Sequence, residues 1–340
     1  MSNIAQAKSK QSYWRLVWRQ FRRNRLALAG LGIVIVLALI ALAAPFLAND
    51  VPDYMIKAGK TYWFPNIIAY DDLTAENFYR SAHRWAPGEG EYALRPPIPF
   101  SPYNQDLTER KLPPTRTHLL GTDDRGRSVI ARLIWGTRIS LTIGLVAVGI
   151  SVSIGVTVGA LAGYYGRLVD MVALRVIEVV MCFPSFFLIL ALVAMLPPSI
   201  YNVMIALGLT GWTGIARLVR GEFLKLRESE FALAASASGL RDFRIMFRHL
   251  LPNALAPVLV SATFGVAGAI LTESSLSFLG FGVPAPTASW GELLNQAHRL
   301  ISTGVWWLVL FPGVAIFLTV TALNLVGEGL RDAIDPRLRQ

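Results

Sequence analysis

Cysteine, histidine and charge are all scarce in this 340-residue sequence. Its one cysteine, Cys182, excludes an intramolecular disulfide. The four histidines are scattered without the spacing of a metal site, and the sequence holds neither a G-x-S-x-G nor an H-E-x-x-H catalytic motif. Charged residues make up 16% of the chain and hydrophobic residues 54%, a balance that indicates an integral membrane protein rather than a soluble domain.

A nucleotide-binding motif is also missing. Gly59, Lys60 and Thr61 imitate the end of a P-loop, but Tyr54 stands where the leading glycine belongs. The chain is therefore expected to hold no cofactor and no metal, and to catalyse no reaction of its own.

Long uncharged runs dominate what the sequence does contain. They cover residues 26–49, 139–166, 179–216, 250–272 and 300–327. Because a helix needs roughly 20 apolar residues to cross the hydrocarbon of a bilayer, each run is long enough to span it. The run 179–216 is nearly twice that length and is interrupted by two prolines at 197 and 198, so it predicts two spans joined by a tight turn. The predicted fold is an all-α membrane protein with about six transmembrane helices.

The basic residues predict the orientation of these spans. Residues 1–25 carry seven basic residues and no acidic one, and residues 217–248 carry seven basic residues against four acidic ones. With six spans, both segments and the basic tail share one side, which the positive-inside rule makes the cytoplasm. The loop 50–137 then lies outside, with eleven residues of each sign. The excess of +10 is explained by topology, and no nucleic-acid partner is expected.

The expected organisation follows from these spans. It comprises a cytoplasmic N-terminus (1–25), a first transmembrane helix (26–49), a large external loop (50–137), a core with five further helices (138–328) and a cytoplasmic tail (329–340). The external loop has no convincing helical period, so turns and short strands are expected there.

One hydrophilic segment, 221–252, interrupts the core. Small residues crowd its part 232–238 and would let another surface approach closely. Gly239 tolerates the left-handed conformation of a helix C-cap, and Pro252 disfavours a helical Leu251. The segment therefore predicts two short helices joined at a bend, outside the membrane and shaped to dock on another surface, with a further break at Leu251.

This segment resembles the coupling loop, or EAA loop, of ABC importer permeases, in which Glu-Ala-Ala is followed by a glycine and later by Leu-Pro. The residues in register are Ala234, Ala235, Gly239, Leu251 and Pro252. Leu233 replaces the glutamate of the family, and His249 replaces a frequent isoleucine. The resemblance implies that the helix seats in a groove of an ATPase, with Arg241 and Arg244 at the rim. The alternative, an amphipathic helix lying on lipid headgroups, explains the arginines but not the small residues.

Further blocks resemble the peptide and nickel branch of these permeases. The first contains Gly121, Asp123, Gly126, Arg127, Arg132 and Arg138, and the others lie at 162–170, 276–291 and 329–336. The two glycines of the first block predict tight turns around Asp123, and Arg132 and Arg138 are expected to bracket the entrance of the second span at the headgroups. The long external loop is similar to that of the C-type subunits of oligopeptide and microcin C-like importers.

The resemblance implies a non-catalytic transport subunit in the bacterial inner membrane, with both termini in the cytoplasm. Implied partners are a second homologous permease, two cytoplasmic ATPase subunits that bind ATP and Mg²⁺, an external solute-binding protein that delivers peptides, and membrane lipid. Nickel or another small solute is the alternative cargo. A secondary transporter would need paired titratable groups in inverted halves, and the candidates here are few and unpaired.

Charges inside the membrane are costly, so each polar residue near a span has two interpretations. Glu273 and its neighbour Ser274 are candidates for the translocation path, but Glu273 could equally cap the packing at the outer rim. Arg175 and Glu178 are expected to pair along one helix. Glu292 and Arg299 are expected to be solvent-exposed in the external loop before the sixth span, with a role in gating as the alternative.

Gly155, Gly159 and Gly163 lie four residues apart in the second span. Such spacing lets another helix approach closely. The neighbour is expected either within the same chain or across a dimer interface.

Overall fold

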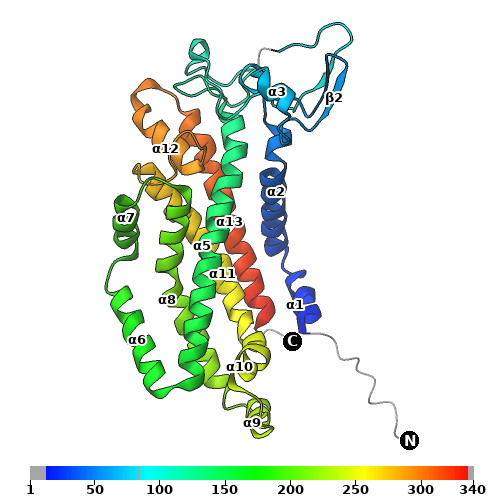
Figure 1. Ribbon diagram of the computed structural model, residues 1–340. Helices are drawn as coiled ribbons and strands as arrows, with labels where there is room; N and C mark the ends of the chain where they lie inside the picture. The colour runs from blue at the N-terminus through cyan, green and yellow to red at the C-terminus, as the bar shows by residue number, and fades with distance from the viewer. Residues whose placement is uncertain (1–12, 83–84, 336–340) are drawn as a thin grey trace, which may run out of the picture.

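The computed structural model describes residues 13–82 and 85–335 (Figure 1). The predictions for most of the basic N-terminus and for the last five residues of the tail lie outside the described residues. Within them, the helices form an elongated bundle with a small lobe of strands and short helices at one end and the short helices α9 and α10 at the other (Figure 1).

The bundle contains most of the chain. Its helices are α1 (Tyr13–Phe21), α2 (Arg25–Leu47), α5 (Val129–Tyr165), α6 (Arg167–Met181), α7 (Ser185–Met195), α8 (Ile200–Leu226), α9 (Glu230–Ala237), α10 (Asp242–Arg244), the π-helix η2 (Ile245–Leu250), α11 (Leu251–Phe278), α12 (Trp290–Arg299), the 3₁₀ turn η3 (Ile301–Thr303) and α13 (Trp307–Ile334). The lobe contains β1 (Tyr54–Lys57), β2 (Lys60–Trp63), α3 (Asp71–Ala75), α4 (Phe78–Ser81), β3 (Tyr92–Leu94) and the 3₁₀ turn η1 (Leu107–Glu109).

Five helical stretches of the described chain are long and apolar enough to cross a membrane: α2, α5, α8, the stretch Asp242–Phe278 and α13. The pair α6 and α7 passes the same test together, although it is bent by 79° at the break between its two helices. The prediction of about six transmembrane helices is confirmed.

Two helices begin before the apolar runs that predict them. The helix α6 begins at Arg167, ahead of the run at 179, and it ends before α7 because Pro184 cannot donate a hydrogen bond to a continuing helix. The helix α5 begins ten residues before the apolar run at 139, and Arg132 in its first turns has partners that are described below. The predicted turn around 197–198 does lie between α7 and α8, where the Ser199 side chain caps α8.

The helices α5 and α8 pack closely along their length. A Cβ atom added at Gly155, Gly159 or Gly163 would lie 2.4 to 2.8 Å from atoms of α8, including the carbonyl oxygen of Ala216. Only glycine permits this approach. The close neighbour predicted for the three glycines is therefore a helix of the same chain.

The main core lies where α5, α7, α8 and α11 meet, with Ile143, Val203 and Ile270 fully buried in it. On one side of the bundle, α2 packs on α13, and Phe21 of α1 is buried near Ala333. The arrangement leaves much of α2 exposed, as expected for a helix that faces lipid.

The lobe confirms the short strands predicted for the external loop. Its three strands form an antiparallel sheet in the order β2-β1-β3, with Tyr54 paired to both Trp63 and Leu94. Met55 and Leu73 are buried in a small core of its own.

Candidate functional site: the coupling segment and the outer network

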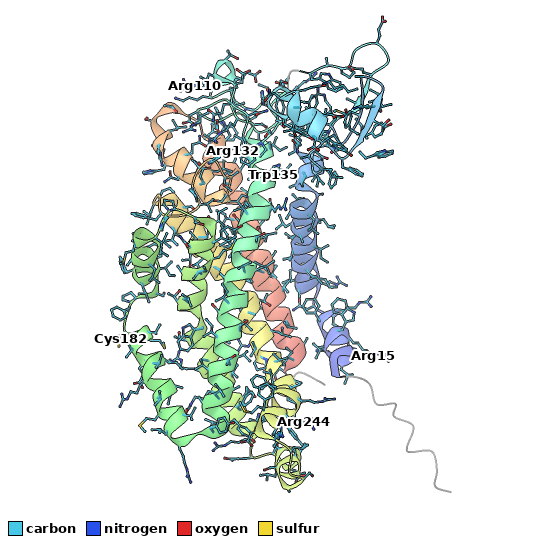
Figure 2. All side chains as sticks on the ribbon, in the orientation of Figure 1. Arg15, Arg110, Arg132, Trp135, Cys182 and Arg244 are labelled. Carbon is cyan, nitrogen blue, oxygen red and sulfur yellow. The ribbon has the colours of Figure 1, made fainter. Side chains whose placement is uncertain are left out.

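The segment between α8 and α11 forms the end of the bundle opposite the lobe, as Figure 2 shows by the positions of Arg244 and Arg110. Here α9 ends at a left-handed Gly239 with φ of +71°. The N–H of Leu240 donates to the carbonyl of Ala235 (3.3 Å) and the N–H of Gly239 to that of Ser236 (3.0 Å). This pair of bonds is a Schellman motif, so the predicted C-cap and bend are confirmed.

The two faces of α9 have different roles. Ala232 and Ala235 are buried against the π-helix η2, in a cluster that includes Ile245 and Met246. The opposite face, with Ala234, is exposed. Ala235 therefore packs within this chain, whereas Ala234 is exposed.

Exposed apolar residues enlarge the surface on which Ala234 lies. They are Phe231, Leu233 and Phe243, of which Phe243 is 72% exposed. The two phenylalanines were not predicted as part of this surface. An aromatic residue in a polar segment outside the membrane is a sequence feature that could have indicated an exposed apolar surface. Leu233 extends this apolar surface at the position where related loops carry glutamate.

Arg241 directly precedes α10, Arg244 is its last residue, and both are exposed. Between them, Asp242 accepts a hydrogen bond from the Tyr164 hydroxyl (2.8 Å), which ties α10 to the last turn of α5. Close by, Arg220 of α8 forms a two-point ion pair with Asp170 of α6, one contact being 2.7 Å long. One polar contact, not predicted from the sequence, therefore joins α10 to α5, and another joins α8 to α6.

The predicted break at Leu251 is wrong. Leu251 is helical, with φ of −56° and ψ of −45°, and α10, η2 and α11 run on without interruption. In the π-helical turn, the N–H of Leu251 donates a hydrogen bond to the carbonyl of Met246, five residues earlier. This wider turn rearranges the hydrogen-bond ladder just before Pro252, which has no N–H and lies in the first turn of α11. Leu251 and Pro252 therefore continue the helix that carries α10.

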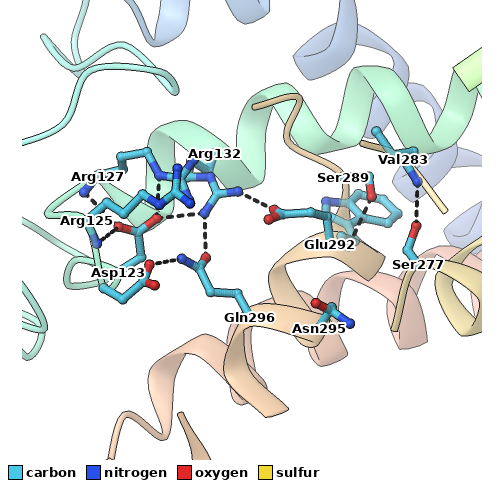
Figure 3. Close-up of polar contacts among 12 residues, drawn as sticks. Asp123, Arg125, Arg127, Arg132, Ser277, Val283, Ser289, Glu292, Asn295 and Gln296 are labelled. Atoms are coloured by element: carbon cyan, nitrogen blue, oxygen red, sulfur yellow. Dashed lines mark hydrogen bonds and ion pairs between the residues drawn. The ribbon is translucent and has the colours of Figure 1, made fainter. Parts of the chain in front are cut away.

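At the other end of α5, a buried network surrounds Arg132 (Figure 3). The fully buried guanidinium donates from Nη1 to Asp123 Oδ2 (2.7 Å) and to Gln296 Oε1 (2.6 Å), and from Nη2 to Glu292. Arg127 donates from Nε to the same Asp123 oxygen at 2.7 Å. The network joins the start of α5 to α12, which lies some 160 residues further along the chain.

Two expectations are corrected by this network. The Arg132 side chain is fully buried against protein partners and not open to headgroups, and the Glu292 side chain, expected to be solvent-exposed, is only 17% exposed. The positive φ of Gly121 and Gly126 confirms the predicted turns around Asp123. A non-local ion pair of this kind leaves no periodic signal in the sequence.

Burial raises the pKa of Asp123, but the guanidinium groups of Arg132 and Arg127 outweigh it. The backbone N–H groups of Arg127 and Arg125, which donate to Asp123 Oδ1 at 2.9 and 2.8 Å, act in the same direction. The pKa of Asp123 consequently lies below its usual value, and the carboxylate stays charged at neutral pH.

Glu273 lies in α11 in a cluster of serines. Its carboxylate is fully buried and accepts hydrogen bonds from the hydroxyls of Ser277 (2.7 Å), Ser289 (3.0 Å) and Ser274 (3.4 Å). These contacts hold the end of α11 to the segment before α12, as expected of a residue that caps packing. The assignment of Glu273 and Ser274 to the translocation path stays a prediction.

A cavity of about 270 Å³ lies deeper in the bundle, between α5, α7, α8 and α11. Hydroxyl groups of Ser151, Thr210, Ser261 and Thr272 are among its lining, together with several glycines. This hydroxyl-lined space was not predicted, because isolated serines and threonines in an apolar run do not distinguish a cavity from ordinary packing. The predicted pair of Arg175 and Glu178 is present at 3.0 Å on the exposed face of α6.

Comparison with known proteins finds two family models that match the sequence of this chain. Residues 155–340 match the model of the binding-protein-dependent transport system inner membrane component, and residues 12–63 match the N-terminal transmembrane domain of oligopeptide transport permease C. The dipeptide transport system permease protein DppC of Alkalihalophilus pseudofirmus is 37% identical over 96% of this chain and 91% of its own length.

Two further relatives cover almost the whole chain. The oligopeptide transport system permease protein OppC of Bacillus subtilis is 33% identical over 98% of this chain and 93% of its own. The glutathione transport system permease protein GsiD of Pectobacterium atrosepticum is 34% identical over 99% and 95%. A chain of the solved MetNI methionine ABC transporter matches with a TM-score of 0.46 at 17% identity, over 58% of this chain and 96% of that chain.

Proposed function

This chain belongs to the family of binding-protein-dependent transport system inner membrane components, and from that premise we propose that it is the C-type permease subunit of an ATP-driven importer of short peptides. The similarity to relatives named for dipeptide, oligopeptide and glutathione transport, over nearly the full chain, supports peptides as the cargo. The partners in this proposal are a second homologous permease, two cytoplasmic ATPases that bind ATP and Mg²⁺, and an external solute-binding protein.

In this proposal the surface formed by Phe231, Leu233, Ala234 and Phe243 docks in a groove of an ATPase, with Arg241 and Arg244 at its rim. Several observations support it: these apolar residues and both arginines are exposed, and they lie on the side that the positive-inside rule assigns to the cytoplasm. Gly239 allows the turn between α9 and α10.

One observation carries the mechanism: α5 is a single helix of 37 residues, about 55 Å long at 1.5 Å per residue. Its inner end is tied to α10 through Tyr164 and Asp242, and its outer end enters the network of Arg132. A displacement of the coupling segment by ATP-driven closure of the ATPases would therefore reach the outer face through one rigid element. The hydroxyl-lined cavity between α5, α7, α8 and α11 is the candidate passage.

Replacing Gly239 with tryptophan tests the docking surface. No atom of the described chain lies within 4 Å of the Cβ position that a substitution adds there, so a bulky side chain has space to leave the backbone, but it would obstruct a docked partner. We expect Gly239→Trp to abolish peptide uptake and uptake-linked ATP hydrolysis while the protein stays in the membrane.

Gly59→Trp in the lobe is the matched control, because Gly59 also has a positive φ and open space around it. The backbone strain in Gly59→Trp is similar to that in Gly239→Trp, and Gly59→Trp should leave peptide uptake intact. Normal import by Gly239→Trp would refute the docking assignment.

Co-purification tests the subunit proposal itself. Extraction in mild detergent should recover the second permease and ATPases with this chain, and hydrolysis should rise with a peptide-loaded binding protein. Recovery of a lone, stable chain that still transports without an ATPase would favour a secondary transporter instead.

A further inference from the structure

A second cavity opens at the outer end of the bundle. It has a volume of about 530 Å³ and lies between the 124–127 turn, the end of α7, the 280–285 segment after α11, and α12. This size is in the range of sites that enclose small ligands. The helix α7 contributes Val193 to this outer pocket and Ile189 to the hydroxyl-lined cavity, so the two spaces border the same helix.

One wall of the outer pocket is positively charged. Arg125, Arg127 and Arg299 line it, against the two carboxylates of Asp124 and Glu292. Both carboxylates already have partners within the chain. Asp124 accepts a hydrogen bond from Gln296. Glu292 accepts one from Arg132 (Figure 3).

The arginines keep unused hydrogen-bonding capacity. Arg127 is 2% exposed, and its Nη1 is buried without a hydrogen-bond partner among the described residues. A buried guanidinium nitrogen without an acceptor is costly. Arg125 is exposed, and its guanidinium makes no ion pair with any carboxylate in the part of the chain that the structure describes. The pocket therefore offers donors and positive charge to an anionic group.

The opposite wall is apolar. Leu196 and Phe281 are each 42% exposed, and Pro198 and Val283 lie beside them. A ligand suited to this pocket has an anionic end for the arginines and small or apolar groups beside it. A free amino acid carboxylate at the end of a short peptide has this character.

We propose that the outer pocket binds the C-terminal carboxylate of a short peptide, through Arg125 and Arg127, with the last side chain of the peptide against Leu196 and Phe281. Arg–carboxylate pairs are frequently bidentate, which orients the bound group as well as holding it. The inference rests on the proposed function, since it assumes a peptide cargo. It adds that the permease itself recognises the free carboxyl end before the peptide enters the passage.

The test compares trialanine with trialanine amide, which lacks the terminal charge. Binding of each is measured by equilibrium dialysis to the complete transporter in nanodiscs, without binding protein. We expect the wild type to prefer the free acid at least tenfold, and Arg125→Gln and Arg127→Gln to lose this preference without weakening the binding of the amide.

Arg116→Gln is the control, because Arg116 is an exposed arginine of the same external segment that does not line the pocket. It should keep the tenfold preference. Since Arg127 is buried and its replacement could impair folding, the exposed Arg125 carries the test by itself. An unchanged preference for the free acid in Arg125→Gln would overturn the proposal.

A second measurement distinguishes two possible occupants of the pocket, the carboxylate of a peptide and an acidic side chain of the binding protein. If Arg125→Gln weakens docking of the ligand-free binding protein and leaves trialanine binding unchanged, the pocket serves that protein and the proposal is overturned. Failure of the proposed function has a different signature, because the wild-type transporter would then import no peptide at all.

Discussion

Single residues decide how the outer end of this molecule is held together. Asp123 is the common partner of two buried arginines, and Arg132 links it to α12 through Glu292 and Gln296. Removing one member of a buried charge network leaves the others desolvated without compensation. The stability of this region therefore depends more on the completeness of the set than on any single hydrogen bond.

Asp123→Asn is expected to destabilise the protein by about 3–5 kcal/mol, because it leaves two buried guanidinium groups short of negative charge. In thermal unfolding of the detergent-solubilised protein, this corresponds to a fall in Tm of roughly 10 °C. Glu89→Gln, at an exposed position of the lobe, should leave the Tm unchanged. Equal Tm values for Asp123→Asn and the wild type would show that the network contributes little.

The stability of the lobe is expected to depend on pH through one carboxyl group. Burial raises the pKa of Asp53 from 3.8 to about 6, so the folded lobe binds a proton more tightly than the unfolded chain does. The contribution of Asp53 to the stability of the lobe should therefore be greatest below about pH 4. It should fall as the pH rises to about 6 and stay nearly constant above that.

Asp53→Asn should remove that dependence, since an amide oxygen can still accept the hydrogen bond from Asn66 Nδ2 that Asp53 Oδ1 accepts at 2.7 Å. Hydrogen exchange of the lobe amides, corrected for the intrinsic rate at each pH, measures the effect. The same slope between pH 4 and 6 in the variant and the wild type would exclude Asp53 as its source.

At the scale of elements, the contact between α5 and α8 is set by three glycines. An added Cβ at Gly159 would lie 2.4 Å from the carbonyl oxygen of Ala216, a backbone atom that cannot rotate away. The two helices would have to separate to accommodate it. In the proposed mechanism α5 also connects the coupling segment to the outer network, so the packing of α5 would affect transport as well as stability.

Gly159→Val should therefore lower the free energy of unfolding by roughly 1–3 kcal/mol, the usual cost of overpacking. Gly149→Val is the matched control on the same helix, since no atom lies within 4 Å of the added Cβ position there. The intrinsic helix propensities change identically in the two variants. Similar Tm values for both would mean that the helices adjust without cost.

The whole molecule has two ends of different character. The lobe lies at one end, while α1, α9 and the end of α13 lie at the other (Figure 1). The basic residues predict that the second end faces the cytoplasm, and the proposed docking surface and outer pocket both depend on this orientation.

Single cysteines in a Cys182→Ala background test the orientation. A membrane-impermeant maleimide should label Glu89→Cys in the lobe of intact spheroplasts, and Asp332→Cys near the end of α13 only after permeabilisation. Both positions are exposed and acidic in the wild type, so their reactivity is comparable. Labelling of both from the same side would contradict the predicted topology.

Much of this protein is determined locally, and those features could be predicted from the sequence. The number of spans follows from the length of the apolar runs, since the bilayer has a fixed thickness. The left-handed Gly239 and the turns at Gly121 and Gly126 follow from the conformational freedom of glycine. Family membership follows from motifs that the chain carries in order.

Other features depend on groups that meet only in the folded chain. The Arg132–Glu292 pair joins residues 160 positions apart and links the first turns of α5 to α12. The serine cluster around Glu273, the burial of Ala235 and the π-turn that keeps the chain helical at Pro252 are equally non-local or context-dependent. The tertiary structure decided these because the cost of burying a charge or breaking a helix depends on which partners surround it.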